Sequence, residues 1–361
     1  MNKKTIRDID VKDKTVLVRV DYNVPLKNGH VAGDIRIKAS LPTIEYLKEH
    51  GAKRIILISH LGRPEGQKVP EMSLEPVVSA LQNLLPDTEV KFVPDVSGPD
   101  VEEAVELMPD GGVLLLENLR FFPGEEENSR EFIQEIINST HAQIFVQDGF
   151  AVIHRAHAST EAITHELPSV MGLLVEKEVA ELTKATENPE HPVLLIIGGA
   201  KVDDKQPLID ALADKVDQIA VVGKIAADGY TPAPEIADKV YVADEFSTDE
   251  TGAKLDISKD CAVKVAMMAS DAKTVIWNGV AGMVEKHPFD AGSATIAMMI
   301  GSSMGDQTSI ICGGDTTAFV EDFREMSLNT AEYSLISTGG GASLEFLTGK
   351  TLPGLEAIED K

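Results

Sequence analysis

The stretch "HPVLLIIGGAKVDDKQ", residues 191–206, indicates how the chain folds, because an apolar run stops at two glycines and two lysines follow. A short apolar run that ends in such a turn is typical of a strand buried on both faces of a parallel sheet. In open parallel sheets, ligands bind beyond the carboxyl ends of the strands, where glycine lets them approach the backbone. We therefore predict an α/β fold with Lys201 and Lys205 beside a ligand site.

The same pattern recurs in two series along the chain. The first comprises "TVLVRV", "RIILIS", "VKFVP", "GVLLLEN" and "AQIFVQD", and the second comprises "VLLIIGG", "QIAVVG", "KVYVAD", "TVIWNG" and "SIICGG". Amphipathic segments separate most of these runs, and strands that alternate with helices build parallel sheets. The sequence thus predicts two doubly wound sheets. Between the two series, "SVMGLLVEKEVAELTKATENP" has helical apolar spacing and predicts a helix that joins them.

The length of 361 residues exceeds what one core usually organises, at about 150 residues per domain. We expect a first domain at 1–170, a bridging helix at 171–188 and a second domain at 189–345. Residues 346–361 form a tail that could return to the first domain.

Composition narrows the class of protein. Hydrophobic residues make up 43% of the chain and charged residues 25%, as in ordinary folded proteins. The net charge of -26 argues against nucleic acid or an anionic membrane as a partner. The start of the chain does not resemble a secretory signal, no run is long enough to span a membrane, and Cys261 and Cys312 are too few for a disulfide framework. We expect a cytoplasmic protein, and the acidic surface favours a monomer.

Several nucleotide-binding motifs are missing from the sequence. It contains neither a G-x-x-x-x-G-K-[ST] phosphate loop nor a G-x-G-x-x-G fingerprint. The protein-kinase motifs are missing too, since "QDGF" is not D-F-G and "IHRAH" lacks the catalytic aspartate. These absences lower the expectation of a Walker ATPase, a dinucleotide enzyme or a protein kinase.

Polar and basic side chains gather at predicted strand ends in the first half of the chain. They are Asp21, Asn23, Arg36, His60, Arg63, Arg120, His154, Arg155 and His157. Guanidinium groups bind phosphate and carboxylate oxygens in bidentate fashion, so several together predict an anion site. Taken singly, each arginine is better explained as an ordinary surface ion pair, and only the shared position favours a site.

In the second half, Lys201 and Lys205 would face the same way if a helix began near Asp203, and both could then reach phosphate oxygens. In the alternative interpretation, Asp203 and Asp204 cap that helix and pair with the lysines. Pro207 fits only the first turn of a helix.

Further candidates follow other strands of the second series. In "IICGGDTTAF" a glycine pair precedes Asp315 and Thr316 at a predicted helix start, where Asp315 could hold Mg²⁺ or cap the helix. "STGGGAS" is a third glycine-rich strand end. "WNGVAGMVE" contributes Asn278 and Glu285, which could also be a turn residue and a surface carboxylate, while Trp277 is expected in the core.

In order along the chain, "RVDYNVPL", "SHLGRP", "LLENLRF", "DGFAVIHRAHAST", "GGAKVDDK", "WNG", "GGDTTA", "STGGGASLE" and "LPG" resemble phosphoglycerate kinase. The resemblance spans nearly the whole chain. It implies two Rossmann-like domains that face each other across a cleft. It also implies reversible transfer of the acyl phosphate of 1,3-bisphosphoglycerate to MgADP, which gives 3-phosphoglycerate and MgATP.

The resemblance also implies roles for individual residues. The phosphoglycerate would be bound by Asp21, Asn23, Arg36, His60, Leu61, Gly62, Arg63, Arg120 and Arg155. The nucleotide would be bound by Lys201, Lys205, Asn278, Glu285, Gly313, Gly314, Asp315 and Thr316. Arg36, Lys201 and Gly314 would act on the transferring group, Glu285 on the ribose, and Asp315 on Mg²⁺. The substrates supply the nucleophile, so the protein would position and neutralise charge while a hinge closes.

The sequence departs from the family pattern on the nucleotide side. Lys224 occupies the place of a glycine-rich turn in the shortened "KIAADGYTPAPEIADKVYVAD", and "LDISKD" replaces the usual D-x-G-P segment. These changes predict an altered nucleotide preference or adenine affinity. Two other hypotheses remain at this stage, a non-catalytic homologue that binds or regulates, and another acyl-phosphate or carboxylate kinase.

Overall fold

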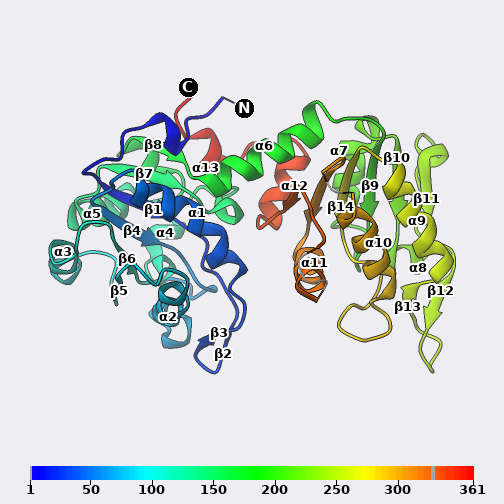
Figure 1. Ribbon diagram of the computed structural model, residues 1–361, viewed down its shortest axis with the longest axis horizontal. Helices are drawn as coiled ribbons and strands as arrows, with labels where there is room; N and C mark the ends of the chain where they lie inside the picture. The colour runs from blue at the N-terminus through cyan, green and yellow to red at the C-terminus, as the bar shows by residue number, and fades with distance from the viewer. Residues whose placement is uncertain (1, 304, 327–329) are drawn as a thin grey trace. The chain divides into compact units, whose positions relative to one another are not determined.

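The computed structural model describes residues 2–303, 305–326 and 330–361. The chain divides into two compact units. Unit 1 runs to Lys177 and resumes at Thr351–Lys361, and unit 2 comprises Glu178–Lys350. Each unit has its own parallel sheet (Figure 1). That these units act as the predicted functional domains stays a prediction.

Across the described residues, unit 1 contains a six-stranded parallel sheet in the order β5-β6-β4-β1-β7-β8. Its strands are β1 (Thr15–Arg19), β4 (Arg54–Ile58), β5 (Val90–Val93), β6 (Gly112–Leu116), β7 (Ile144–Gln147) and β8 (Ser169–Met171). A small antiparallel ribbon pairs β2 (Leu26–Lys27) with β3 (His30–Val31). Every residue of β1 is buried, which explains its continuous apolar pattern.

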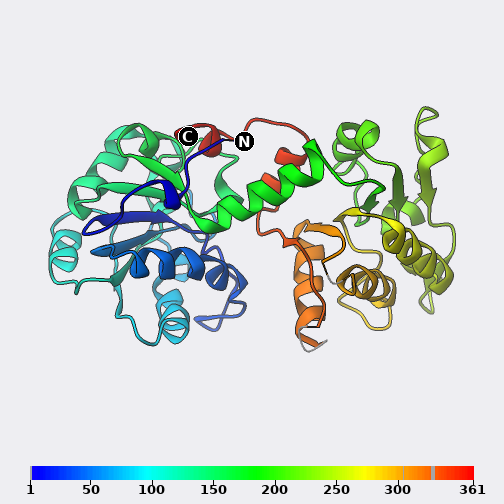
Figure 2. The same ribbon diagram turned by 45° about the horizontal axis from the view of Figure 1, so that its top comes forward.

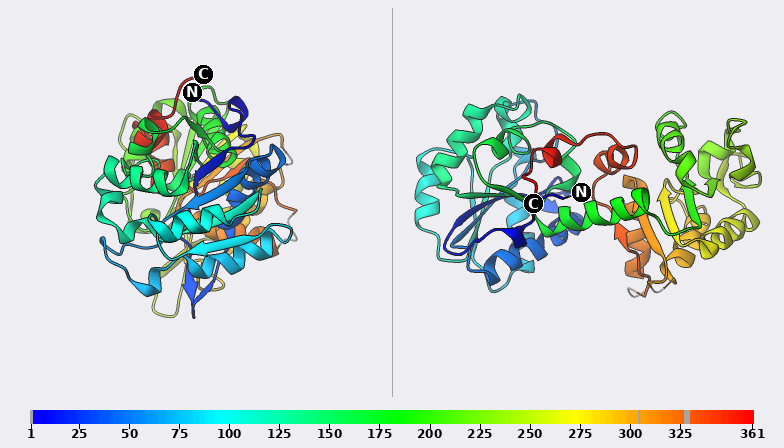
Figure 3. Two further views of the ribbon diagram at one scale, coloured as in Figure 1. Left: turned by 90° about the vertical axis from the view of Figure 1, so that its left-hand side faces the viewer. Right: turned by 90° about the horizontal axis from the view of Figure 1, so that it is seen from above.

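Helices cover both faces of this sheet (Figure 3). The helices of unit 1 are α1 (Ile35–Glu49), α2 (Glu75–Leu84), α3 (Pro99–Glu106), α4 (Pro123–Glu126), α5 (Arg130–Thr140) and α13 (Pro353–Glu356). Val16 and Val18 of β1 share a core cluster with α1 and α2, while Leu17 shares another with α3 and α5. Successive strand residues thus point to opposite faces, and both faces are buried.

Unit 2 repeats the architecture with the order β11-β10-β9-β14-β15-β16 in its described residues. These strands are β9 (Val193–Ile197), β10 (Gln218–Val221), β11 (Val240–Val242), β14 (Thr274–Asn278), β15 (Thr308–Cys312) and β16 (Leu335–Ile336). All the pairings are parallel. The predicted fold class, two doubly wound parallel sheets of Rossmann-like type, is therefore confirmed.

The helices of unit 2 are α7 (Gln206–Leu212), α8 (Gly223–Ala227), α9 (Lys259–Asp271), α10 (Ala291–Gly301), α11 (Gly314–Met326) and α12 (Gly341–Leu347). Helix α9 packs against α10 (Figure 2), and α7 contacts α12. A twisted antiparallel ribbon pairs β12 (Phe246–Thr248) with β13 (Lys254–Ile257), and β13 contacts α8. This ribbon forms one wall of a pocket.

Helix α6 (Leu173–Glu187) carries the chain from unit 1 into unit 2, at the place where a helix was predicted. The end of the chain belongs to unit 1, where the backbone N–H of Lys4 donates to the carbonyl of Glu359 at 2.8 Å. Lys3 also forms an ion pair with Asp360 at 3.0 Å. Both ends of the chain are therefore fixed to the same unit (Figure 1).

The structure corrects one local prediction. Helix α7 begins at Gln206 with Lys205 as its N-cap, not near Asp203. The reason is Pro207, which has no N–H and therefore occupies the first turn. Lys201 consequently lies in the turn before the helix, and within the described chain neither Lys201 nor Lys205 forms an ion pair with Asp203 or Asp204.

The short strand β8 was not predicted, because it lies at an edge of its sheet and has only three residues, too few for a periodic pattern. The other short edge strand, β16, ends directly before "STGGGAS", where a strand end was predicted. Among the helices that the structure describes, none is long and apolar enough to cross a membrane.

Candidate active site

Unit 1 gathers arginines at the carboxyl edge of its sheet. Arg19 ends β1, Arg36 lies in the first turn of α1, and the others follow β4, β6 and β7. Because parallel strands end at the same edge, segments far apart in sequence meet there. We call this set, Arg19, Arg36, Arg63, Arg120 and Arg155, the arginine cluster.

Arg19 lies at the base of the cluster and is completely buried. Its Nε donates to the hydroxyl of Ser159 at 2.8 Å, and a terminal nitrogen donates to Nδ1 of His60 at 3.1 Å. The carboxylate of Glu125, also fully buried, lies 4.0 Å from the guanidinium and accepts from the Ser159 hydroxyl at 2.7 Å. A buried cation needs such partners, so this network is what lets Arg19 remain charged.

Arg36 forms an ion pair with Asp21, whose carboxylate is almost buried. Asp21 and Asn23 both belong to the loop after β1, and the amide oxygen of Asn23 accepts from the N–H of Gly62 at 2.9 Å. Arg120 donates to the carbonyl of Gly62 at 2.8 Å. Three loops are thus joined into one surface by polar side chains from the predicted set.

The two histidines here have pKa values shifted away from the charged form. Burial, followed by the charges of Arg19, Arg120 and Arg36, holds the pKa of His60 well below its usual range. Burial and three arginines lower the pKa of His157 to about 4. Both imidazoles are therefore neutral at pH 7, and the cluster keeps an excess of positive charge that favours an anion.

The arginines differ in exposure. Arg120 is buried, pairs with Glu126 at 3.2 Å, and has its pKa lowered to about 10, by burial first and by Arg19 second. Arg155 is half-buried and donates to Nε2 of His154 at 3.3 Å. Arg63 is exposed and has no ion pair within the described residues. The donors of Arg63 are therefore accessible to a ligand, whereas those of Arg120 are buried.

Leu61 has a different place. Its side chain is buried, and its carbonyl accepts from the amide of Asn118 at 2.7 Å. It therefore shapes the loop that carries His60 and Arg63 and offers the site only its backbone.

Unit 2 has its candidate site at the carboxyl ends of β9, β14 and β15. A pocket of about 240 Å³ lies there, which we call the glycine pocket. It is lined by Gly199, Ala200, Lys201, Asp204, Lys205, Gly279, Gly313, Gly314, Asp315 and Thr316. The structure thus brings together Lys201, Lys205 and the predicted set Gly313 to Thr316.

Glycine is required where two of these strand ends touch. A side-chain carbon on Gly198 would lie 2.4 Å from the carbonyl oxygen of Gly279, which is closer than any real contact. Gly279 itself has φ +110, a conformation that favours glycine. The two strand ends can therefore lie backbone against backbone, and the floor of the glycine pocket consists of peptide groups.

Asn278 and Thr316 hold the pocket's polar groups in place. The ammonium group of Lys205 donates to the amide oxygen of Asn278, whose nitrogen donates to Sγ of Cys312 at 3.3 Å. The fully buried Thr316 accepts from the N–H of Gly279 at 2.8 Å. Burial lowers the pKa of Lys205. Asn278 therefore fixes the position of the Lys205 ammonium. The buried Thr316 holds the backbone at Gly279 in place and is not an exposed group for a ligand.

Lys201 and Asp315 are exposed at the rim of the same pocket. Asp315 lies in the first turn of α11, where the first N–H groups have no partner inside the helix. Such N–H groups attract phosphate oxygens. One carboxylate fits Mg²⁺ that takes its other ligands from a nucleotide and water, and the described residues contain no group of three or more metal-binding side chains.

A second pocket, of about 220 Å³, shares Gly199, Ala200 and Asp315 with the first. We call it the ribbon pocket, because β12 and β13 supply Phe246, Lys254, Leu255 and Asp256 to its lining. The remaining lining residues are Gly223, Lys224, Ala227, Val280, Ala281, Gly282, Met283 and Glu285. The shortened nucleotide-side segments therefore still enclose a pocket, and Glu285 is exposed at it.

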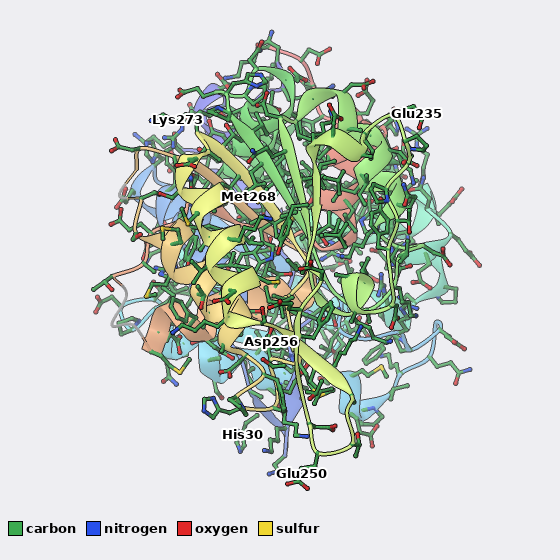
Figure 4. All side chains as sticks on the ribbon, turned by 90° about the vertical axis from the view of Figure 1, so that its right-hand side faces the viewer. His30, Glu235, Glu250, Asp256, Met268 and Lys273 are labelled. Carbon is green, nitrogen blue, oxygen red and sulfur yellow. The ribbon has the colours of Figure 1, made fainter. Side chains whose placement is uncertain are left out.

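Asp256 connects two elements of the ribbon pocket through hydrogen bonds. Its two carboxylate oxygens accept from the N–H groups of Ile257 and Gly292, each at 2.8 Å. Burial raises its pKa to about 6. Figure 4 shows Asp256 at the base of the ribbon and Glu250 at its far end. The residue thus fixes the ribbon to the start of α10.

Sequence reasoning missed several of these residues. Arg19 could have been identified from the sequence, because an arginine inside the apolar run "TVLVRV" must be paired when the strand is buried. Its partners Glu125 and Ser159 carry no such signal, because only the tertiary fold brings them together. The same holds for Phe246 and Lys254, which a hairpin pattern could place on a ribbon but not in a pocket.

Comparisons with known proteins identify this arrangement. A family model described as phosphoglycerate kinase matches residues 6–231 and 230–350. The structure of phosphoglycerate kinase from Coxiella burnetii is 32% identical, with a TM-score of 0.78, and 98% of each chain is covered. Phosphoglycerate kinase from Pyrococcus horikoshii OT3 is 27% identical, with a TM-score of 0.84 and the same coverage. The chain therefore belongs to the phosphoglycerate kinase family and is an enzyme of that type.

Proposed function

We propose that the enzyme transfers the acyl phosphate of 1,3-bisphosphoglycerate to MgADP, giving 3-phosphoglycerate and MgATP, and that it also catalyses the reverse reaction. One observation carries this proposal. Each unit gathers cations at the carboxyl edge of its own sheet, the arginine cluster in one and the glycine pocket in the other. Two anion sites of different design suit two different phosphorylated substrates.

The arginine cluster suits the phosphoglycerate. Its guanidinium groups can bind carboxylate and phosphate oxygens in pairs, and neutral His60 can donate through the ring nitrogen that Arg19 does not occupy. Arg63 and Arg155 offer the accessible donors, while Asp21 and Asn23 can accept from a hydroxyl group. We assign Arg36, which has about a third of its side chain exposed, to the transferring group.

The glycine pocket suits the phosphates of the nucleotide. Lys201, Lys205 and the N-terminus of α11, which begins at Gly314, would neutralise the oxygens of the transferring group. Asp315 would hold Mg²⁺, which when bound neutralises charge on the nucleotide phosphates. Asn278 orients Lys205, and Glu285 is placed to contact the ribose in the ribbon pocket.

This reaction needs no nucleophilic side chain, because an ADP oxygen or the carboxylate of 3-phosphoglycerate attacks the phosphorus in line. The protein's task is to position the substrates and to stabilise charge. Transfer requires both units to contact the same phosphoryl group, so we propose that a hinge movement closes the enzyme and excludes water. We also propose that the chain acts as a monomer in the cytoplasm.

The proposal is tested by supplying 1,3-bisphosphoglycerate and MgADP to the purified full chain and measuring ATP formation. The expected result is turnover that saturates with both substrates and needs Mg²⁺. Turnover with neither ADP nor any other purine nucleoside diphosphate contradicts the proposal.

A further inference from the structure

The ribbon pocket lies where the base of a bound nucleotide would extend. It shares Gly199, Ala200 and Asp315 with the glycine pocket, so a diphosphate in the glycine pocket leaves the rest of the molecule room in the ribbon pocket. Its volume, about 220 Å³, is bounded by the aromatic ring of Phe246 and by apolar residues such as Val280 and Met283. A flat aromatic base suits these surroundings.

The polar group that distinguishes this pocket is Lys254. Its ammonium nitrogen lies 4.6 Å from the centre of the Phe246 ring and donates to the carbonyl of Ala227 at 3.3 Å. No carboxylate pairs with it in the described residues of the chain. An ammonium group has three donors, so Lys254 keeps donors for a ligand, while the ring limits where its charge can lie.

The other charged groups of the ribbon pocket are already engaged or lie elsewhere. Lys224 donates to both carboxylate oxygens of Asp228, at 2.8 and 2.7 Å. Asp256 accepts from two backbone N–H groups. Asp315 and Glu285 are assigned above to magnesium and ribose. Among the charged side chains that line the ribbon pocket, Lys254 is therefore the one best placed to form hydrogen bonds with the base.

Purine bases differ in what they offer to such a donor. Guanine presents two acceptors side by side, O6 and N7, and lysine commonly binds both. Adenine presents the acceptor N7 beside the donor N6–H₂, which a lysine cannot match, whereas glutamine can match both. Hypoxanthine has the same O6 and N7 acceptors as guanine.

We propose that Lys254 determines the nucleotide specificity of this enzyme by selecting 6-oxopurine nucleoside diphosphates, such as GDP and IDP, over ADP. This inference rests on the proposed function, since it assumes that the glycine pocket holds the diphosphate. It goes further because it names the base and the side chain that recognises it.

The test measures the dissociation constants of MgGDP and MgADP by titration calorimetry with the full chain. GDP is expected to bind about tenfold more tightly than ADP. Lys254→Arg should keep this preference, because arginine also binds O6 and N7. Lys254→Gln should reverse it in favour of ADP.

Lys264→Ala serves as the matched control. Its ammonium lies 3.9 Å from the Tyr241 ring centre, so it makes the same kind of contact as Lys254 but does not line the pocket. The ratio of GDP to ADP affinity should be unchanged in this variant. Circular dichroism confirms that each variant is folded.

Each outcome is decisive. Equal or tighter binding of ADP by the unmodified chain, or an unchanged ratio in Lys254→Gln, overturns the inference alone. If the chain binds neither GDP nor ADP, both the inference and the proposed function are overturned. Selective GDP binding without turnover of 1,3-bisphosphoglycerate overturns the proposed function and leaves the inference standing.

Discussion

The two anion sites differ in how their charges are supported. In the arginine cluster of unit 1, Arg19 and Glu125 are completely buried and joined through Ser159. In the glycine pocket of unit 2, Lys201 and Asp315 are exposed, and peptide groups form the floor. The comparison indicates that the charges of Arg19 and Glu125 are part of the core of unit 1, whereas the charges of Lys201 and Asp315 are added to a surface that backbone geometry has already shaped.

This difference has a consequence for mutation. Removing a buried charge leaves its partner unpaired in a place that excludes water, which destabilises the fold. Removing an exposed charge leaves the fold intact and affects only the ligand. Variants of the buried charges of unit 1 should therefore lower both stability and activity, and variants of the exposed Lys201 and Asp315 of unit 2 should lower activity alone.

The largest expected effect is on stability. Arg19→Met should lower the free energy of unfolding by about 3–5 kcal/mol, because Glu125 loses its buried cation. Arg63→Met, which changes an exposed arginine, should alter it by less than about 0.5 kcal/mol. Urea denaturation measures both. Equal losses in the two variants would contradict the contrast between buried and exposed charge.

The next effect is on catalysis. Arg36→Ala and Lys201→Ala should each lower kcat by at least about 100-fold, because each removes a cation from the transferring group. Lys201→Ala should leave the melting temperature unchanged, since the residue is exposed. Arg36→Ala should lower it, since Asp21 loses its partner. Activity that survives either substitution would remove that residue from the proposed mechanism.

A smaller effect depends on pH and arises in unit 1. Asp148 is fully buried, and one of its oxygens accepts from the N–H of Leu174 at 3.0 Å. Burial raises its pKa to about 8, from 3.8. Since the folded state holds this proton more tightly, its stabilising contribution is complete below about pH 4 and is lost as the pH rises through 8.

Asp148→Asn removes this titration. The stability that this variant gains over the unmodified chain should be larger at pH 9 than at pH 5, by up to about 4 kcal/mol. Denaturation at the two pH values measures the difference, with the exposed Asp110→Asn as control. Burial raises the pKa of Asp256 in unit 2 to about 6, but Asp256 is present in both chains, so its titration cancels in this comparison. A difference that does not vary with pH would contradict the assignment.

The smallest effect is at the ribose. Glu285→Gln should raise the KM for the nucleotide about fivefold and leave the KM for the phosphoglycerate unchanged, because only unit 2 loses a contact. Steady-state kinetics with each substrate varied in turn measures this. A raised KM for the phosphoglycerate would contradict the assignment of Glu285 to the ribose.

Sequence reasoning predicted most of the fold because its strands are long and apolar. "TVLVRV" and "VLLIIGG" became β1 and β9, buried along their whole length, and Trp277 lies in the core as expected. The start of α7 was placed wrongly, because the aspartates at 203 and 204 looked like caps although Pro207 required a later start. Edge strand β8 was missed because it is too short for a periodic pattern.

The candidate site was predictable where residues sit at strand ends. Asp21 and Arg120 in unit 1 and Lys205 in unit 2 follow from that rule, because each lies beyond a strand at the carboxyl edge of its own sheet. Glu125 and Lys254 did not follow from it. Glu125 lies in the short helix α4, and Lys254 in a ribbon outside the main sheet, so only tertiary packing reveals what they face.

The central claim is that the two sites serve one phosphoryl transfer. The most direct measurement mixes the unmodified chain with 1,3-bisphosphoglycerate, Mg²⁺ and either GDP or ADP, and follows nucleoside triphosphate and 3-phosphoglycerate together. The account predicts equal amounts of both products, with faster formation when GDP is the acceptor. Release of inorganic phosphate without triphosphate, or no reaction with either nucleotide, would contradict it.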